Sequence, residues 1–418
     1  MNKRIVGCFL AVVLATSASA QVSTTLSPYS QYGLGALAEQ SQGASRGMAG
    51  LAYGLRNGSQ VNTLNPASYS SVDSLTMLID VGLTGQITNF KENNKSVNGH
   101  TATIEYAVAS FRLMPKVGVA LGILPYTNIG YTFTGSSSSG ATNYYAGDGG
   151  ISQLLIGVGW EFMKGFSLGV NFSYLWGDYS KALSVYNSDN YVNSISREYY
   201  MTVHSYKLDF GLQYQKDLGK NDLLTAGLTL GVGHSLSSTA ELINSSVNAQ
   251  TNVSNTSPTL TVEDAFRLPW TVGLGASVLH RKSLMVGVDY LFQKWGSLSY
   301  PVFDGTSYTL SDNYYKNRHK VTGGVDWQPN PVSRSYMNRV HYRLGASYAT
   351  PYYYIKGANG PSEMVLSAGF GLPISRSQLN ISGQWVRTAA NDFIKENTFR
   401  INIGLTFNER WFAKWKVD

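Results

Sequence analysis

Six histidines are the side chains best suited to hydrolytic chemistry: His100, His204, His234, His280, His319 and His341. A hydrolase would bring one of them to a serine and an acid, and a helical zinc site would need two of them four residues apart. No histidine pair has the zinc spacing. His204-Ser205 and His234-Ser235 are neighbours, so in a strand their side chains point to opposite faces. We therefore expect no enzyme, no metal and no cofactor, although a catalytic pair built from separate strands stays open.

Charged residues recur at every second position within amphipathic runs, and this is the second candidate chemistry. The members of this set are Arg318, Lys320, Arg343, Arg400, Asp289 and Asp326. A charge that faces lipid near the membrane midplane costs several kcal/mol, so these positions are expected to face a lumen. There they could pair across strands and hold a plug, or they could steer an anionic substrate; both interpretations stay open.

Pro125 is the third candidate, because it interrupts an apolar run that contains Gly118 and Gly122. Proline cannot donate a hydrogen bond to a sheet and is confined to edges and bulges. A closed barrel has no edge. Pro125 therefore indicates a bulge and a lateral gap in the wall, or else a strand end outside the membrane.

The composition shows which elements must position these residues. Charged residues are only 14% of the 418, against roughly 25% in soluble domains. Mean hydropathy is nevertheless -0.12, so apolar and small polar residues alternate. Residues 1–20 have a basic start, a short apolar run and Ala18-Ser19-Ala20, the pattern of a cleaved signal peptide. The net charge of +7 comes from bases scattered singly, which argues against a nucleic-acid partner.

The rest of the chain, residues 73–418, alternates with a period of two residues. Phe399, Ile401 and Ile403, for example, are interleaved with Arg400 and Asn402. About 14 such runs are present, the even number expected of a bacterial transmembrane barrel. The runs are 74–90, 101–114, 116–133, 150–163, 165–180, 196–215, 222–240, 264–279, 283–300, 314–328, 339–355, 361–372, 377–389 and 395–408. We therefore predict an all-β fold, a transmembrane antiparallel β-barrel with a hatch in its lumen.

Loops and aromatic pairs support the same architecture. Tight turns at 162–166 and 279–283 alternate with polar loops at 91–100, 134–149, 186–195, 241–260 and 303–313, as at the periplasmic and extracellular ends of a barrel. Tyrosine clusters stand near run ends, at 144–145, 199–200, 314–315 and 352–354. Amphipathic rings favour the headgroup level of a bilayer, so these clusters are expected to form interface girdles; a surface that stacks against sugars is the alternative.

Residues 21–72 are rich in Gly, Ser and Asn and show neither a helical nor a strand period, which indicates compact irregular structure. Three motifs in them resemble the hatch of the FadL/TodX family of outer-membrane transporters: Gly33-Leu34-Gly35, Arg46-Gly47-Met48-Ala49-Gly50, and Asn65-Pro66-Ala67-Ser68 before the first strand. In that family an Asn-Pro-Ala hatch plugs a barrel of fourteen strands. The resemblance implies that Asn65, Pro66 and Ala67 belong to such a hatch.

The resemblance also implies a function. A hydrophobic ligand, such as a long-chain fatty acid, would pass the hatch and leave sideways into the outer membrane through a kinked third strand. The third run is the one that holds Pro125. Relatives of the family also serve in protein secretion, so a scaffold or shuttle component of a secretion or assembly machine is the alternative. A polar porin is disfavoured because residues 21–72 would obstruct an aqueous lumen.

Overall fold

The computed structural model is a closed antiparallel β-barrel of 14 strands, which confirms the fold class predicted from the alternation. The structure describes residues 27–410 apart from 93–94, 137–140, 187–188, 190–191, 249, 252 and 392. The expected signal peptide, residues 1–20, lies outside the described residues, as do residues 411–418.

Consecutive strands pair around the ring, and the last pairs with the first through sixteen residues from Thr76↔Arg410 to Lys91↔Lys395. The barrel strands are β2 (Thr76–Glu92), β3 (Lys95–Met114), β4 (Val117–Ser136), β5 (Thr142–Met163), β6 (Phe166–Tyr186), β7 (Ser194–Leu218), β8 (Asp222–Gly231), β12 (Thr271–His280), β13 (Leu284–Gln293), β16 (Arg318–Trp327), β17 (His341–Ala349), β20 (Ser362–Ile374), β21 (Ser377–Ala389) and β22 (Lys395–Arg410).

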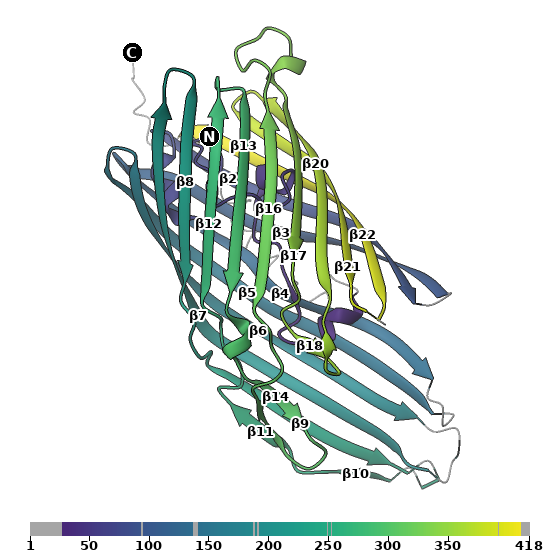
Figure 1. The fold of residues 1–418 in the computed structure, drawn as a ribbon. Helices are drawn as coiled ribbons and strands as arrows, with labels where there is room; N and C mark the ends of the chain where they lie inside the picture. Colours follow the sequence, from purple (N-terminus) through teal and green to yellow (C-terminus); the bar gives the residue numbers. More distant parts are fainter. Residues whose placement is uncertain are drawn as a thin grey trace, which may run out of the picture.

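The two ends of the barrel differ (Figure 1). At one end, hairpins close over two or three residues, as at 115–116, 164–165 and 281–283. At the other, strands β4 to β7 continue far beyond the rest of the sheet. The expected polar loops at 91–100 and 134–149 are therefore mostly strand residues, because their Ser, Thr and Asn side chains still pair in an extended ladder.

Smaller elements cover the long end and the connections. They are β9 (Ser238–Val247), β10 (Ser254–Thr256), β11 (Leu260–Glu263), η3 (Trp295–Ser297), β14 (Tyr300–Phe303), β15 (Tyr308–Ser311), η4 (Met337–Arg339), β18 (Tyr354–Ile355) and β19 (Ala358–Asn359).

Alternation along each strand separates an apolar outer face from a polar inner one. On β6, Leu168, Phe172 and Tyr174 are exposed while Asn171 and Ser173 are buried. An exposed apolar surface of this kind is what a bilayer requires. The outward side chains of β6 become polar after Trp176, at Asp178 and Ser180, which marks one edge of the lipid-facing band.

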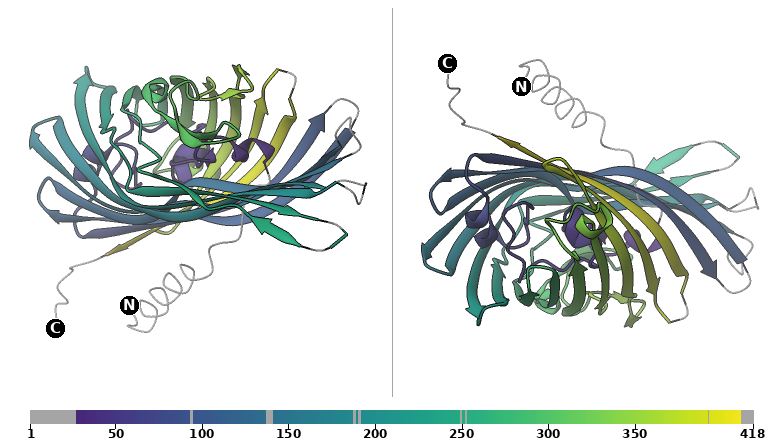
Figure 2. Two further views of the ribbon diagram at one scale, coloured as in Figure 1. Left: turned by 90° about the horizontal axis from the view of Figure 1, so that it is seen from below. Right: turned by 90° about the horizontal axis from the view of Figure 1, so that it is seen from above.

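The hatch, here residues 27–72, runs inside the ring of strands (Figure 2). It holds only short elements: η1 (Pro28–Gln31), β1 (Ala36–Leu37), α2 (Gly43–Arg46) and η2 (Pro66–Ser71). Hydrogen bonds from wall side chains reach its backbone carbonyls at several levels. Within the described part of the chain, no helix is long and apolar enough to cross a bilayer.

Two of the tyrosine clusters expected at the lipid interface, at 314–315 and 352–354, lie elsewhere. Tyr315, Tyr352 and Tyr353 are buried with Trp295 in an aromatic cluster inside the long end of the barrel. The girdle interpretation is wrong for these residues, because their strand ends lie beyond the lipid-facing band and their rings turn inward. Tyr29 and Leu34 of the hatch belong to the same cluster.

Candidate functional site: the hatch and a break in the barrel wall

The wall of the barrel is interrupted between β3 and β4. Their ladder extends from Met114↔Val117 only to Ala107↔Ile123. Beyond it, residues 95–106 of β3 pair with β2, and residues 124–136 of β4 pair with β5. The β2–β3 and β4–β5 hairpins end apart from each other in Figure 1. We call this unpaired stretch the wall break.

A piece of the hatch pairs with the free edge of β4 at the wall break. Strand β1 runs antiparallel to β4 with Ala36 opposite Asn128 and Leu37 opposite Thr127. The backbone N–H of Ala38 donates to the Tyr126 carbonyl at 3.0 Å. The Gln40 side chain donates to the Pro125 carbonyl at 2.7 Å. The hatch thereby satisfies backbone groups that β3 leaves unpaired, as a membrane interior demands.

Pro125 lies where the β4–β5 register shifts, between Pro125 and Thr127, at the beginning of the wall break. Its ring cannot donate to a neighbouring strand, which fits the loss of the β3 partner there. Gly118 and Gly122 lie in the paired part of β4. A Cβ on Gly118 would come within 1.9 Å of the Tyr69 carbonyl oxygen, so this glycine lets the hatch backbone approach the wall.

The hatch has three charged residues, Glu39, Arg46 and Arg56, and each faces an opposite charge on the wall. Arg46 lies 3.5 Å from Glu105 of β3, and Arg56 lies 2.7 Å from Glu161 of β5. Glu39 lies 3.9 Å from Lys320 of β16. Their presence in an otherwise uncharged segment was a signal in the sequence, but the partners on distant strands could not be identified from it.

Arg46 is the most connected of the three and is only 3% exposed. Its guanidinium donates to the Ser41 carbonyl at 3.0 Å and to Thr84 at 3.0 Å. It also donates to Asn402 at 3.2 Å. A buried guanidinium requires this many acceptors, so Arg46 fixes helix α2 against β2 and β22.

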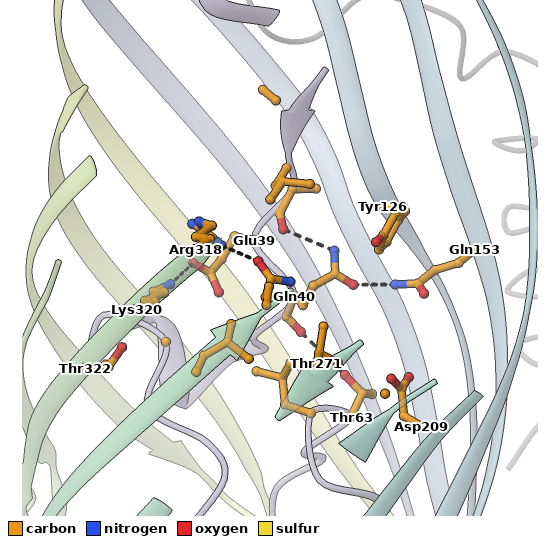
Figure 3. A pocket seen from close by; sticks show the side chains of 18 of the residues that line it. Glu39, Gln40, Thr63, Tyr126, Gln153, Asp209, Thr271, Arg318, Lys320 and Thr322 are labelled. Carbon is orange, nitrogen blue, oxygen red and sulfur yellow. Dashed lines mark hydrogen bonds and ion pairs between the residues drawn. The ribbon is translucent and has the colours of Figure 1, made fainter. Parts of the chain in front are cut away.

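A cavity of about 230 Å³ lies between the hatch and the wall (Figure 3). Leu37, Ala38 and Tyr126 at the wall break belong to its lining. Its charged lining balances, with the bases Arg46, Lys207, Arg318, Lys320 and Arg400 and the acids Glu39, Glu105, Asp209, Asp289 and Glu363. Gln153 and Gln40 hydrogen-bond across it, as Figure 3 shows. Because bases and acids are equal in number, the lining does not favour an anionic ligand.

The six charged residues singled out in the sequence all lie on the inner side of the wall. Arg318, Lys320 and Arg400 line the cavity. Asp289 is 4% exposed and accepts the backbone N–H groups of Ala52 and Tyr53 at 2.6 and 2.9 Å. Closer to the short-turn end, Arg343 donates to Asp326 at 2.9 Å, and His341 contacts the same carboxylate.

Asn65, Pro66 and Ala67 begin η2 and are buried. The Asn65 carboxamide oxygen accepts from the Ala67 backbone N–H at 3.2 Å, as an N-cap does, while its amide donates to the Tyr53 carbonyl at 2.9 Å. Pro66 stands at a first helical position, where its missing donor costs nothing. The motif thus joins two turns of the hatch and presents η2 to the wall.

A second cavity, of about 250 Å³, lies toward the long end and is lined mainly by aromatic rings, among them Tyr131, Tyr179 and Phe266. Lys181 is the cation in its lining. Its ammonium donates to the Gln31 and Gly33 carbonyls of the hatch at 2.8 and 3.1 Å. Burial lowers the pKa of Lys181 to about 7.

On the opposite wall, Glu396 accepts a 2.7 Å hydrogen bond from the Ser27 hydroxyl at the start of the hatch. Burial raises the pKa of Glu396 to about 7. Both Glu396 and Lys181 lie beyond the lipid-facing band, which on β22 begins at Phe399 and on β6 ends at Trp176. They hold the first turn of the hatch from two sides.

Ser45 lies in a sequence pattern that is typical of a nucleophilic serine in a hydrolase. The structure does not arrange a catalytic site around it. Gly43-Ala44-Ser45-Arg46-Gly47 has the Gly-x-Ser-x-Gly pattern, but Ser45 lies within the short helix α2 instead of a strand-to-helix turn. Among the described hydrogen bonds, none joins Ser45 to a histidine. In the described part of the chain, no group of three His, Cys, Asp or Glu side chains could hold a metal ion.

Several solved structures share this fold. The Pseudomonas putida toluene transporter TodX has a TM-score of 0.66 at 13% identity, over 90% of this chain and 100% of its own. The Ralstonia pickettii toluene transporter TbuX has a TM-score of 0.64 at 14% identity, over 89% and 99%. A Pseudomonas aeruginosa FadL homologue has a TM-score of 0.60 at 10% identity, over 90% and 99%.

At these identities the likeness concerns the fold. Among curated proteins, none matches the sequence. A family model described as BamG matches residues 1–418.

Proposed function

The chain belongs to the BamG family, and we propose that it is an outer-membrane barrel that carries hydrophobic small molecules, such as long-chain fatty acids, into the bilayer through the wall break. The observation that carries the proposal is the replacement of β3 by the hatch strand β1 as the partner of β4. In this proposal the short turns face the periplasm and the long strands face outward.

The inner face of β4 supplies a path. Tyr131 lines the aromatic cavity, and the buried Ile129 and Thr127 follow along the same face of β4, within the wall break, to the β1–β4 ladder. An apolar molecule gains by burial against aromatic rings and loses in the charged cavity behind β1. The route therefore follows β4 and avoids the ion pairs. The descriptions of TodX and TbuX as toluene transporters support a hydrophobic cargo.

A reversible lock tests this route. Leu37 and Thr127 stand opposite each other in the β1–β4 ladder, at a separation that suits a disulfide. The double variant Leu37→Cys, Thr127→Cys should lose uptake of a fluorescent fatty acid when oxidised and regain it when reduced. The matched control is Ala109→Cys, Leu121→Cys, a pair in the continuous β3–β4 ladder. Equal uptake by both oxidised variants would contradict the lateral route.

A second candidate function follows from the family description and from the charged cavity. The name BamG hints at an assembly-related role, so the barrel could serve as a scaffold component of a machine that inserts other barrels. The three ion pairs and the close packing of hatch against wall favour a fixed body over an open conduit. In this case the protein partners would carry the function.

Depletion separates the two candidates. An assembly component should, when depleted, lower the amount of other folded outer-membrane barrels, measured by their heat-dependent mobility on gels. A transporter should leave those barrels unchanged and lower only tracer uptake. The oxidised Leu37→Cys, Thr127→Cys variant should rescue barrel assembly but not uptake if both functions exist.

A further inference from the structure

Every strand connection at the short-turn end of the barrel carries an exposed basic side chain. There are six such connections, between β3 and β4, β5 and β6, β7 and β8, β12 and β13, β16 and β17, and β20 and β21. Five of them are turns of two or three residues, and the one between β16 and β17 is longer, spanning residues 328–340 with η4. In chain order their exposed bases are Lys116, Lys164, Lys220, Lys282, Arg334 and Arg376. Because the strands form a closed barrel, these residues make a basic ring around its whole circumference.

The acids at this end do not balance the ring. Asp217 is exposed near the end of β7, and Asp222 at the start of β8 pairs with His280. Asp73 and Glu409 are exposed beside the junction of β2 and β22. At the long end, by contrast, exposed bases have acidic neighbours, as Lys91 has Glu92 and Arg267 has Asp264. Among the described residues, exposed positive charge therefore predominates at the short-turn end.

The backbone shows that two of these bases, Lys116 and Lys282, and the neighbouring Arg281 occupy unfavourable positions. Lys116 has φ 68, Arg281 has φ 49 and Lys282 has φ 56, in the left-handed region that favours glycine. The turns at Gly165 and Gly219 meet the same requirement with glycine, at φ 80 and φ 79. The conformation of the turns does not explain why Lys or Arg occupies positions 116, 281 and 282. We therefore look for a partner that interacts with their positive charge.

The position of the basic ring along the barrel axis, relative to the membrane boundary, indicates the partner. Trp160, Trp327 and Phe370 are 53%, 49% and 51% exposed, and each lies on an outward face within a few residues of a turn. Large exposed aromatic side chains of this kind mark the boundary between hydrocarbon and headgroups. The bases one step farther along the barrel axis then stand at the level of the phosphates.

We propose that the basic ring binds the headgroups of anionic phospholipids in the leaflet at the short-turn end. A docked protein would touch one side of the barrel, whereas lipid surrounds it, and the bases are distributed over all six connections. Juxtamembrane Lys and Arg attract anionic headgroups within a Debye length of the surface. The inference rests on the membrane location in the proposed function, but not on the cargo or the wall break.

The test uses the full protein reconstituted in phosphatidylcholine vesicles, with brominated lipids as quenchers of tryptophan. Trp160 and Trp327 lie on the lipid face beside the ring and report lipids bound there. Brominated phosphatidylglycerol should associate about threefold more strongly than brominated phosphatidylcholine at low salt, and high salt should reduce the ratio. The ratio should fall to about one in the sextuple variant with Gln in place of Lys116, Lys164, Lys220, Lys282, Arg334 and Arg376.

A matched control removes six bases from the long end. It places Gln at Lys91, Lys95, Arg267, Lys294, Lys356 and Lys395 and should keep the preference for phosphatidylglycerol. Heat-dependent mobility on gels verifies that each variant is folded. An equal ratio in the wild type, or an unchanged ratio in the ring variant, would overturn the proposal and direct the search to an acidic protein partner.

Discussion

The hatch is held differently in the two halves of the barrel. Toward the long end, its first residues pack into an aromatic cluster in which Tyr29 and Leu34 are 7% and 0% exposed. At the level of the lipid-facing band, the same segment is held by ion pairs, backbone hydrogen bonds and close contacts with wall glycines. Apolar packing resists water but tolerates sliding, whereas ion pairs and backbone contacts fix one position.

The contrast assigns different tasks to the two halves. The aromatic half excludes water from the lumen, since rings such as Tyr352 and Tyr353 pack edge to face around the hatch. The polar half sets the register of the hatch against the wall break. Changes in the aromatic half should therefore affect sealing and stability, and changes in the polar half should affect where β1 lies.

Deleting the hatch should have the largest effect, because it removes both kinds of contact together. A variant without residues 27–70 should still close its barrel through the β2–β22 ladder, which involves no hatch residue. We expect a large steady ion conductance in planar bilayers where the full protein shows little. Unchanged conductance would mean that wall and loop residues seal the lumen without the hatch.

Trp295→Ala tests the aromatic half alone. Trp295 is fully buried and contacts Tyr315 and Tyr352 at centroid distances of 5.3 and 4.9 Å. Removing a buried tryptophan should lower the free energy of unfolding by about 3–5 kcal/mol, measured by urea titration of the protein in vesicles. The exposed Trp270 supplies the matched control, and Trp270→Ala should change it by less than about 1 kcal/mol.

The barrel strands could be predicted from the sequence. The different contacts that hold the hatch in the aromatic half and in the polar half could not. Alternation of period two identifies barrel strands because lipid and lumen impose opposite demands on successive residues. The tyrosines at 314–315 and 352–353 look the same in the sequence whether they face headgroups or a buried cluster. Their position depends on how far β4 to β7 extend. Likewise the pairing of Arg46 with Glu105 depends on the path of an irregular segment, which no period describes.

Gly118→Ala tests the polar half. The new methyl group would meet the Tyr69 carbonyl oxygen and Ser70 nitrogen, so the hatch must shift at a cost of about 1–3 kcal/mol. Gly383 is the matched control, since a Cβ there has no heavy atom within 4 Å. We expect Gly118→Ala, but not Gly383→Ala, to alter the distance between spin labels on the hatch and on β4. Identical distances in both variants would show that the wall glycines do not set the position of the hatch.

The smallest expected effect is a pH dependence in the docking of the first turn of the hatch. Lys181 and Glu396 hold this turn from opposite walls. The pKa of Lys181 falls from 10.5 to about 7 on burial, so the undocked state binds more protons between those values. Docking should therefore strengthen as pH rises from about 7 to 10. The pKa of Glu396 rises from 4.5 to about 7, so the docked state binds more protons in that window, and docking should weaken as pH rises through it.

The two windows meet near pH 7, where docking should be weakest, by an amount on the order of 1 kcal/mol because water can reach both groups when the turn loosens. Spin labels at Gln31 and Lys395 would report this as the broadest distance distribution near neutrality. Lys181→Met should abolish only the change above pH 7, because no other cation contacts the Gln31 and Gly33 carbonyls in the described part of the chain. Glu396→Gln should abolish only the change below it. A distribution that varies in one direction from pH 5 to 10 would mean that one group alone controls docking, and the aromatic half would then hold the rest of the turn without help from charge.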